Sequence, residues 1–600
     1  MKLDTSIVFD TSTFSTYLMK NRAILFLTAI AAFFIISFTI TGNKDTLPTA
    51  DKNNGGLFLP GHFKAVVVVD SLAGRARHLA VNDNGDVYVK LRFPDSIGGN
   101  VAMRDTNYDG KADIIKKFAD YEDKGSYGTA MRVHKGYLYF SSEINVYRMK
   151  LNPNSLVPDG KPELIVHDIH PPQEHDAKPL AFDNKGHMYV AFGAPSNACQ
   201  EQNRVPGSMG IEGCPLLKEF GGIWQFDEAK PNQLQADGMR YATGLRSVVA
   251  MDWNTADNCL YVVAHGRDDL RLQFPKLFTP WQSAVLPAEE FLKIKEGTDV
   301  GWPYYYYDPI KKKKLLNPEY GGDGKKAGDG AKYAQPIMAF AAHWAPNDLL
   351  FYTGNQFPAR YKNGAFVAFH GSTNRSPYPQ AGFFIGFVPF KGGKPAGSWE
   401  IFADGFAGRT TIASVSDAVY RPMGISQGPD GSLYISDTEK GRVWRIFYPG
   451  DKTKFTTAQL AKMELRKKLP SFKTPDITRN NLMSGMLTGG AKLYATYCTN
   501  CHQKNGKGDG NLFPPLGGSE WVTGGKYMEK ETAIRVLLNG LEGPVKVKNV
   551  PYNSVMPKHN FLSDDQIAQV LTYIRNNFGN NSSLVTALEV KKVRASLKVK

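Results

Sequence analysis

GPDGSLYI, residues 428–435, is a turn signal followed by a strand of alternating apolar residues, and this pattern decides the expected fold. Alternation after a tight turn is typical of a half-buried strand. Five similar stretches precede it along the chain: NDNGDVYV (82–89), HKGYLYF (134–140), NKGHMYV (184–190), ADNCLYVV (256–263) and NDLLFYTG (347–354). Their tyrosines stand 50 to 91 residues apart, whereas one four-stranded propeller blade takes about 40 to 50 residues. Six copies therefore predict a six-bladed β-propeller over residues 55–450, with insertions between strands.

Length and composition agree with a mainly β protein of more than one domain. A chain of 600 residues exceeds what one hydrophobic core usually supports. Its 12% aromatic residues, 58 glycines and 36 prolines suit short strands joined by turns. The net charge of +15 is spread along the chain, so we expect no nucleic-acid binding. An irregular all-β domain is the alternative to the propeller.

The N-terminal segment predicts export. Residues 23–40, AILFLTAIAAFFIISFTI, form an apolar run that Lys20 and Arg22 precede. The length of the run fits either a signal peptide or a membrane span. We therefore assign residues 1–45 to a signal peptide or an N-terminal anchor, and expect a periplasmic protein that is either free or held at the inner membrane by residues 23–40.

The motif CTNCH, residues 498–502, is the pattern that attaches a c-type haem. We expect the thiolates of Cys498 and Cys501 to bond one covalent haem c and His502 to ligate its iron. Haem of this type is attached outside the cytoplasm, which agrees with the predicted export. The motif indicates a small all-α class I cytochrome c domain over residues 488–580.

Met556, in the stretch NSVMPKHNF, is the expected second iron ligand. It precedes a well-marked helix, which begins with Ser563 and Gln566 as a capping box. His/Met ligation would raise the iron potential and suit electron acceptance. Met528 is the alternative ligand. Residues 451–487 are then a linker, and residues 581–600 a basic C-terminal tail.

RDTNYDGKAD, residues 104–113, has oxygen-bearing side chains at the spacing of a calcium loop. The four predicted ligands occupy positions 1, 3, 5 and 9 of the loop: Asp105, Asn107, Asp109 and Asp113. Lys116 stands where an EF-hand has glutamate, so the loop is no EF-hand. We predict a structural calcium loop, with an Asx-rich turn as the alternative.

Three cysteines lie outside the haem motif. In an oxidising compartment Cys199 and Cys214 either form a disulfide that closes a small loop or remain free. Cys259 lies within the apolar stretch CLYVVA, so we expect it to be a buried, inert thiol.

One histidine and three arginines stand near turns or strand ends of the predicted propeller: His175, Arg246, Arg375 and Arg421. The central channel of a propeller would gather such arginines into a cationic pocket for a polyanionic ligand. The alternative is a structural histidine with solvated surface arginines.

Residues from about 60 to 450 resemble the glucose/sorbosone dehydrogenase family, which are six-bladed propellers that use pyrroloquinoline quinone. The similarity is greatest to the sorbosone-dehydrogenase-like proteins with a fused cytochrome c. Seven stretches carry the resemblance: HDAKPLAFDNKGHMYVAFGAPSNAC (175–199), YATGLRSVVAMDW (241–253), AHGRDDL (264–270), DVGWPYY (299–305), HWAPNDLLFYTGNQFP (343–358), AFHGSTNR (368–375) and RPMGISQGPDGSLYISD (421–437).

The resemblance implies roles for residues of the propeller. His175 matches the histidine that acts as general base in the family, seven residues before Phe182. Arg246 matches the arginine that contacts the quinone carbonyl, although Ser247 replaces the asparagine that follows it in relatives. The remaining implied contacts are the quinone-facing Arg375 and Arg421, and a calcium ion held by the backbone carbonyls of Gly266 and Arg267.

The function implied is that of an exported, quinone-dependent sugar or aldehyde dehydrogenase. His175 would take a proton from a substrate hydroxyl while hydride passes to the quinone. Electrons would continue to the chain's own haem and then to a downstream acceptor, such as a soluble cytochrome or an oxidase. One alternative is a non-catalytic propeller that binds sugar or protein and carries an electron-transfer cytochrome. A metal-dependent propeller hydrolase is disfavoured, because the predicted pocket residues are histidine and arginine rather than carboxylates.

Overall fold

The computed structural model describes residues 47–121, 129–412, 414–475, 478–524 and 530–597, without the side chains of residues 478–485. The predicted signal or anchor segment lies outside the described residues, and so does Met528. None of the helices within the described ranges is long and apolar enough to cross a membrane.

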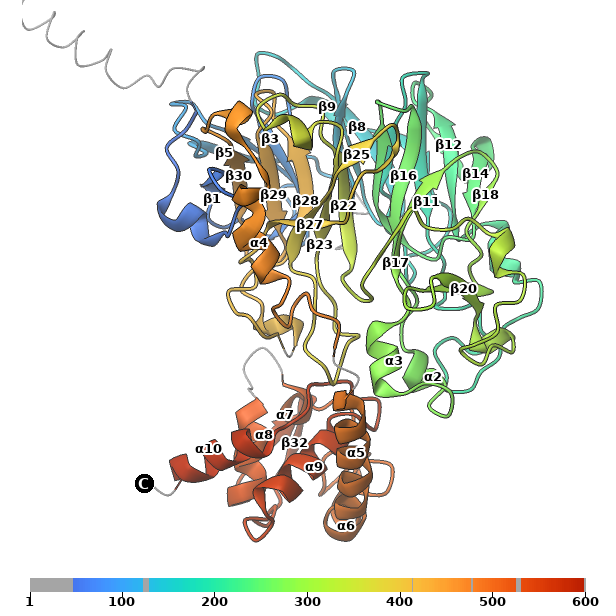
Figure 1. Cartoon of the computed structure of the whole chain (residues 1–600), viewed down its shortest axis with the longest axis vertical. Coiled ribbons are helices and arrows are strands. Elements are labelled where there is room, and N and C mark those ends of the chain that lie inside the picture. The colour runs from blue at the N-terminus through green and yellow to red at the C-terminus, as the bar shows by residue number, and fades with distance from the viewer. Residues whose placement is uncertain (1–46, 122–128, 413, 476–477, 525–529, 598–600) are drawn as a thin grey trace, which may run out of the picture.

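Six antiparallel sheets of the N-terminal region form the blades of a propeller (Figure 1). Blades 1 and 2 contain β2 (Ala76–Val81), β3 (Val87–Leu91), β4 (Asn100–Arg104) and β5 (Ile114–Phe118), then β6 (Met131–His134), β7 (Tyr137–Ser141), β8 (Asn145–Lys150) and β9 (Asp159–His167). Blades 3 and 4 contain β10 (Leu180–Phe182), β11 (His187–Phe192), β12 (Gly222–Asp227) and β14 (Met239–Thr243), then β15 (Val248–Asn254), β16 (Cys259–Ala264), β17 (Glu289–Ile294) and β21 (Met338–Phe340). Blades 5 and 6 contain β22 (Pro346–Phe351), β23 (Ala365–Phe369), β24 (Phe384–Val388) and β27 (Glu400–Ala403), then β28 (Pro422–Gln427), β29 (Leu433–Asp437) and β30 (Val443–Phe447).

The ring closes between the two ends of the propeller sequence. β1 (Lys64–Val69) pairs antiparallel with β30 and supplies the fourth strand of blade 6. The first strands of the six blades contact one another in a closed ring, in the order β2, β6, β10, β15, β22, β28 and back to β2. The predicted six-bladed propeller is therefore confirmed.

Short strands extend or decorate this ring. β13 (Gln233–Leu234) pairs with β9, and β18 (Thr298–Asp299) pairs with β14, each in parallel. Two small hairpins form in the insertions, from β19 (Tyr305–Asp308) with β20 (Lys313–Leu316) and from β25 (Phe390–Lys391) with β26 (Lys394–Pro395). Helices α2 (Leu270–Gln273) and α3 (Pro280–Val285) lie in the insertion between β16 and β17.

The recurring tyrosines bond neighbouring blades together. The hydroxyls of Tyr88, Tyr139 and Tyr352 donate to backbone carbonyls at residues 156, 228 and 431, which belong to the next blade or its loops. Five of the six sequence copies lie on the second strand of a blade. The copy with Tyr352 differs, because residues 347–351 belong to the first strand, β22. The blade count from sequence was right, although this one copy of the pattern lies on the first strand of its blade rather than the second.

The segment after the propeller is packed rather than free. α4 (Ala461–Arg466) lies against β27. Met463 and Phe472 are buried in the hydrophobic core formed by blades 4 and 5. Much of the predicted linker, residues 451–487, is thus a strap along the propeller.

The C-terminal domain is helical, as predicted. It contains α5 (Thr478–Tyr497), α6 (Thr499–His502), α7 (Glu520–Thr523), α8 (Lys530–Asn539), α9 (Asp564–Ile574) and α10 (Ala587–Leu597). It also has a hairpin of β31 (Val545–Val547) and β32 (Val550–Tyr552). α10 lies within the predicted basic tail, and its Val590 and Val593 are buried in the core of the domain.

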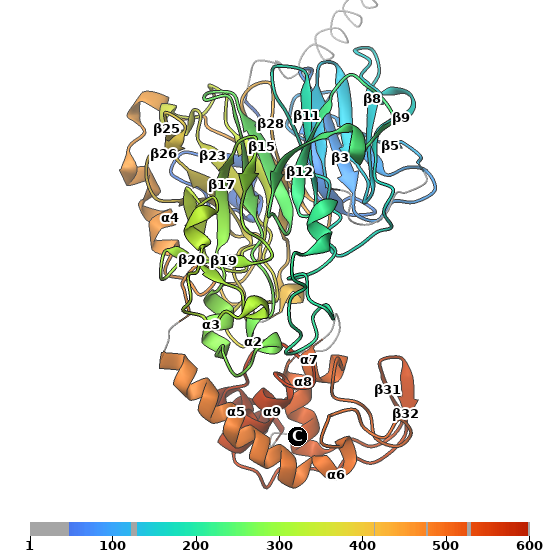
Figure 2. The same ribbon diagram turned by 90° about the vertical axis from the view of Figure 1, so that its right-hand side faces the viewer.

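The helical domain lies at one end of the propeller, beside α2 and α3 (Figures 1 and 2). Trp281 of α3 donates its indole N–H to the Pro475 carbonyl at 2.7 Å. A small apolar cluster joins the two parts and includes Tyr378 from the propeller with Met486 and Leu584. In both views α6, with the haem motif, is at the end of the domain away from the propeller.

Candidate functional site

The mouth of the propeller gathers charged side chains from several blades. Arg421 directly precedes the first strand β28, and Arg246 stands two residues before the first strand β15. His265 and His370 directly follow the second strands β16 and β23. In an antiparallel pair, the start of one strand meets the end of the next. All four residues therefore lie at the same end of the ring, and they are close enough for Arg246 to lower the pKa of His265 and for His265 to lower that of His370.

His175 lies in the loop that leads to β10. Its Nδ1–H donates to the Ala194 carbonyl at 2.5 Å, which leaves Nε2 as the basic nitrogen. The loop needs Gly193, because a Cβ there would lie 2.0 Å from the His175 carbonyl oxygen. Burial, and then the charge of Arg246, lower the pKa of His175 well below 6.5, so the imidazole is neutral at neutral pH.

Arg246 is held from two sides and is 5% exposed. Its Nη1 donates to the Gly266 carbonyl at 2.8 Å, and its Nη2 donates to Asp268 at 2.5 Å. Among the residues that the structure describes, its Nε is buried without a partner. A buried cationic donor of this kind is favourable only when an acceptor meets it, so the arginine fits an anionic ligand.

Asp268, which sequence reasoning did not single out, joins the cationic groups of this site. Besides Arg246, it accepts hydrogen bonds from Arg204 at 3.1 Å and from the Asn374 amide at 2.6 Å. Burial favours its neutral form, but the guanidinium groups of Arg246 and Arg204 hold the pKa of Asp268 well below its usual range. The sequence feature that could have identified Asp268 is its position directly after the stretch HGR, at the end of a strand.

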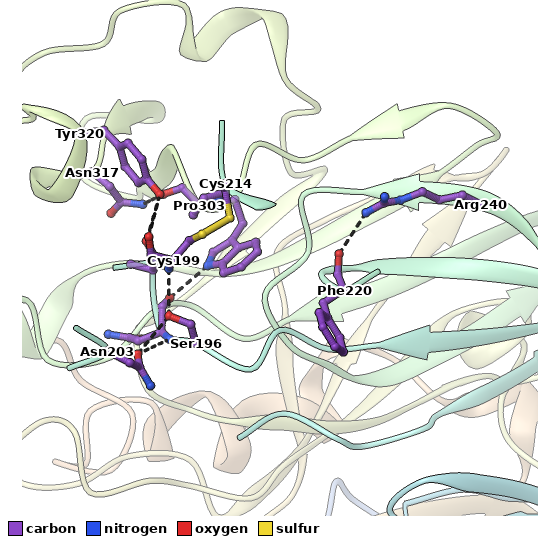
Figure 3. Close-up of a disulfide and its surroundings, with 12 residues drawn as sticks. Ser196, Cys199, Asn203, Cys214, Phe220, Arg240, Pro303, Asn317 and Tyr320 are labelled. Carbon is purple, nitrogen blue, oxygen red and sulfur yellow. Dashed lines mark hydrogen bonds between the residues drawn. A yellow bond between two sulfur atoms is a disulfide. The ribbon is translucent and has the colours of Figure 1, made fainter. Parts of the chain in front are cut away.

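A disulfide closes a loop in the insertion between β11 and β12 (Figure 3), beside the segment that contacts Asp268. Cys199 and Cys214 are bonded, which confirms one of the two readings of these cysteines. In the same loop, Asn197 accepts from the Asp268 backbone N–H and donates to its carbonyl, both at 3.0 Å. Trp302 packs against the disulfide and donates to the Asn197 carbonyl at 3.0 Å. The disulfide-closed loop thereby positions the carboxylate that faces Arg246.

Arg375 and Arg421 have hydrogen-bond partners that differ from those of Arg246. Arg421 donates to the carbonyls of His370 and Gly371 and contacts His370 Nδ1 at 2.8 Å, at the far side of the mouth. Arg375 instead donates to the Lys473 carbonyl at 3.0 Å, on the strap. The mouth of the propeller therefore brings together His175, Arg246 and Arg421, and not Arg375.

Neither predicted calcium site is tested by the structure. The Gly266 carbonyl accepts from Arg246, and the side chain of Arg267 forms a buried ion pair with Glu319. In the loop at residues 104–113, Asp105 accepts from the Gly110 N–H, and Asp113 from Thr106. The side chain of Asn107 accepts from the Asp109 N–H. Within the described ranges no three His, Cys, Asp or Glu side chains gather in a metal-binding group, so calcium stays a prediction at both places.

The haem-motif residues surround one apolar cavity in the helical domain. Cys498, His502 and Met556 line this cavity of about 100 Å³, and Cys501 lines the adjoining one. His502 donates Nδ1–H to the Pro514 carbonyl at 2.9 Å, which leaves Nε2 free for a metal. The walls are apolar side chains that include Leu516, Val522, Leu537, Val570 and Ile574. The residues fit a haem with one histidine and one methionine ligand.

His559 is a second residue that sequence reasoning missed. It lines both parts of the cavity, is 9% exposed, and has no described partner for its buried Nδ1. It follows Met556 by three residues in the stretch MPKH. That spacing was the available signal for a polar group beside the haem.

Two sequence profiles match the chain, one over each region. A profile described as TrAA12-like matches residues 59–307 and 316–448, and a cytochrome c profile matches residues 487–578, which include Cys498 and Cys501. The helical domain is therefore of the haem c type.

Two individual relatives each match about a fifth of this chain. Cytochrome c-552 of Thermus thermophilus is 40% identical over 130 residues, which are 20% of this chain and 87% of that protein. The fructose dehydrogenase cytochrome subunit of Gluconobacter japonicus is 34% identical over 123 residues, 20% of this chain and 24% of that subunit.

Solved structures support the propeller fold. The calcium structure of the Trichoderma reesei family AA12 protein matches 68% of this chain and 100% of its own length, with a TM-score of 0.52 and 16% identity. The holo form of the pyranose dehydrogenase PQQ domain from Coprinopsis cinerea matches 67% of this chain and 99% of its own, with a TM-score of 0.52 and 16% identity.

Proposed function

This chain belongs to the TrAA12-like family and carries a cytochrome c domain, and on that premise we propose that it is a quinone-dependent dehydrogenase. Its substrates are sugars or aldehydes in the lactol or hydrated form, and its electrons pass to its own haem. The relative whose printed name supports this most directly is the pyranose dehydrogenase PQQ domain. We further propose that the protein is exported to the periplasm, where haem c is attached.

The observation that carries the proposal is a neutral histidine beside an incompletely paired arginine at the propeller mouth. Bound pyrroloquinoline quinone would supply the acceptor for the hydride of the substrate carbon, which carries both electrons of the oxidation. Arg246 would hold an oxygen of this group through its Nε–H, which has no partner among the described residues, and Arg421, which is paired with Glu439 at 3.6 Å, would face the group from the far side of the mouth.

His175 acts as the general base in this proposal. Its Nδ1–H is fixed on the Ala194 carbonyl, so Nε2 accepts the proton of the substrate hydroxyl. Asp268 stabilises the imidazolium that results, because its charge raises the pKa of His175 against the opposing effect of Arg246. The carbonyls of Gly266 and Arg267 remain the proposed calcium ligands, and no step depends on them here.

The haem domain provides the exit for electrons. Cys498 and Cys501 would hold the haem, and His502 and Met556 its iron. Because α6 lies at the end away from the propeller (Figure 2), the haem motif is accessible to an external acceptor such as a soluble cytochrome or an oxidase.

Reduction of the haem by substrate tests the proposal. The haem-loaded chain is incubated with Ca²⁺ and pyrroloquinoline quinone, and the haem α-band is followed after addition of aldoses or aldehydes. We expect reduction that requires the quinone and disappears in His175→Ala. His187→Ala is the matched control, since that histidine lies in the same blade, bonds Asp183 and has a side chain that is 40% exposed.

One outcome would reject the enzyme, and a second would reject His175 as its general base. If the quinone does not bind, the chain is a non-catalytic propeller that carries an electron-transfer cytochrome. If His175→Ala reduces the haem as fast as the parent protein, another group removes the proton.

A further inference from the structure

A second cavity lies where blades 4 and 5 meet the strap that leads to the haem domain. Its volume is about 280 Å³. Phe340, Trp344 and Trp399 line it from the blades, and Phe472 and Thr474 from the strap. None of the residues that line the pocket around Arg246 and Gly266 lines this cavity. The cavity is therefore separate from the proposed quinone site.

Arg375 is the charged residue in the wall of this cavity. It is 1% exposed, and one nitrogen, Nη2, donates to the Lys473 carbonyl. Its Nε and Nη1 are buried and have no hydrogen-bond partner, and it forms no ion pair within the described part of the chain. Burial lowers the pKa of Arg375 to about 10, so the guanidinium is still charged at neutral pH.

The side chain of Arg375 points away from the mouth of the propeller, in the direction opposite to that of its neighbour Asn374. Asn374 directs its amide to Asp268, whereas Arg375 reaches the strap in the other direction. Burying a charged group whose N–H donors are only partly satisfied is unfavourable. Trp344 adds a second buried donor without a described partner, its Nε1–H. A ligand that supplies acceptor oxygens here would remove both penalties.

We propose that this cavity binds a small monocarboxylate with an aromatic body, whose carboxylate accepts the free N–H groups of Arg375. The rings of Trp344, Trp399 and Phe472 would pack against the hydrocarbon part. An apolar cavity of about 150 Å³ can hold benzene, so the larger volume here has room for a ring and a carboxylate. The proposal does not depend on the proposed dehydrogenase reaction.

A ligand bound in this cavity would also strengthen the connection between the propeller and the haem domain. Phe472, Thr474 and Pro475 form one wall of the cavity, and α5 begins at Thr478. A ligand between this wall and the blades would stabilise the strap at the point where it enters the haem domain.

Binding of benzoate to the haem-loaded full chain tests the proposal. Isothermal titration calorimetry gives its affinity, and saturation-transfer NMR of the benzoate ring protons detects binding independently of heat. We expect benzoate to bind at least tenfold more tightly than benzyl alcohol, which lacks the charge, or acetate, which lacks the ring. Arg375→Met should weaken benzoate at least tenfold. Arg409→Met, which removes an exposed arginine, should not change it.

A second variant covers the case in which Arg375→Met does not fold. Thr474 is exposed at the rim, so Thr474→Trp should fill the cavity and abolish benzoate binding without removing core residues. A further titration of benzoate in the presence of saturating pyrroloquinoline quinone and Ca²⁺ tests whether the carboxylates of the quinone occupy the same cavity. We expect the affinity for benzoate to be unchanged. Equal binding by the variants and the parent, displacement of benzoate by the quinone, or no benzoate binding would each overturn the proposal.

Discussion

The mouth of the propeller and the haem cavity position their reactive groups in opposite ways. At the mouth, Arg246 and His175 are set by hydrogen bonds and charges from loops of different blades. In the haem domain, His502 and Met556 face an apolar space that a compact helical core encloses. The first site depends on long-range assembly of the ring, and the second on one continuous stretch of about a hundred residues. The two sites should therefore fail independently and respond differently to substitution.

Loss of the haem should be the largest effect. Replacing Cys498 and Cys501 together by alanine removes both thioether bonds, so no haem should remain on the denatured chain. Haem-stained gels and the pyridine haemochrome spectrum measure this. Cys259→Ala is the control, because that buried thiol is free and lies in blade 4. Quinone binding should persist in the double variant; its loss would show that the two regions are coupled.

Substitution at the propeller mouth should slow the reaction without affecting the haem. Arg246→Met removes the donor placed for an anionic oxygen, and loss of one such donor typically lowers kcat about 10²–10³-fold. Substrate-driven haem reduction measures the rate, and Arg535→Met is the charge-matched control, because this arginine of α8 has a side chain that is 41% exposed. A change of less than tenfold would place Arg246 outside the chemistry, as a purely structural partner of Asp268.

The pH dependence of kcat/KM distinguishes the buried histidine from an exposed one. An unperturbed histidine would be half protonated near pH 6.5. Because burial and Arg246 lower the pKa of His175, its basic form persists below that pH. We expect kcat/KM to stay nearly constant between pH 7.5 and 6.5, a range over which an unperturbed histidine would lose nearly half of its basic form, and we expect the acid limb at lower pH. In Arg246→Met this limb should move to higher pH, since a repelling charge is gone; an unmoved limb would assign the titration to another group.

The smallest predicted effect concerns His559 in the haem cavity. Its unpartnered Nδ1 borders the space where the haem would lie, so it can hydrogen-bond the cofactor or its solvent. Groups around a haem tune its potential, and His559→Ala should shift the midpoint by tens of millivolts, on the order of 1 kcal/mol. Spectroelectrochemical titration measures the shift, with Lys558→Ala as the adjacent control. Equal potentials in the two variants would leave His559 a packing residue.

The contrast between the two regions also explains what sequence reasoning found. The haem residues lie at short, fixed spacings, so Cys498, Cys501, His502 and Met556 were identified before the cavity was known. The six-blade count followed from a repeat whose tyrosines connect neighbouring blades. The copy at residues 347–354 matched the pattern on a different strand, because alternation alone does not distinguish the first strand of a blade from the second.

The polar network at the mouth of the propeller was harder to predict from the sequence than the haem residues were. Arg246 and His175 were predicted from their positions and given roles by a resemblance, whereas Asp268 and Asn374 were not singled out, since their convergence depends on the paths of two long insertions. Arg375 is adjacent to Asn374 in sequence, yet it lies in a different cavity. The loop backbone determines that the side chains of Asn374 and Arg375 point in opposite directions. Residue type alone does not predict this.

The pairing of β1 with β30 has a consequence for how the chain acquires its shape. Residues 64–69 find their partners only at residues 443–447, so this early strand waits until one of the last propeller strands has been synthesised. Closing so long a loop is entropically costly and slow compared with local pairing. The haem domain follows β30 in the chain, after the strap. Emergence of CTNCH therefore comes after every strand needed to close the ring, and the order of synthesis places haem attachment last.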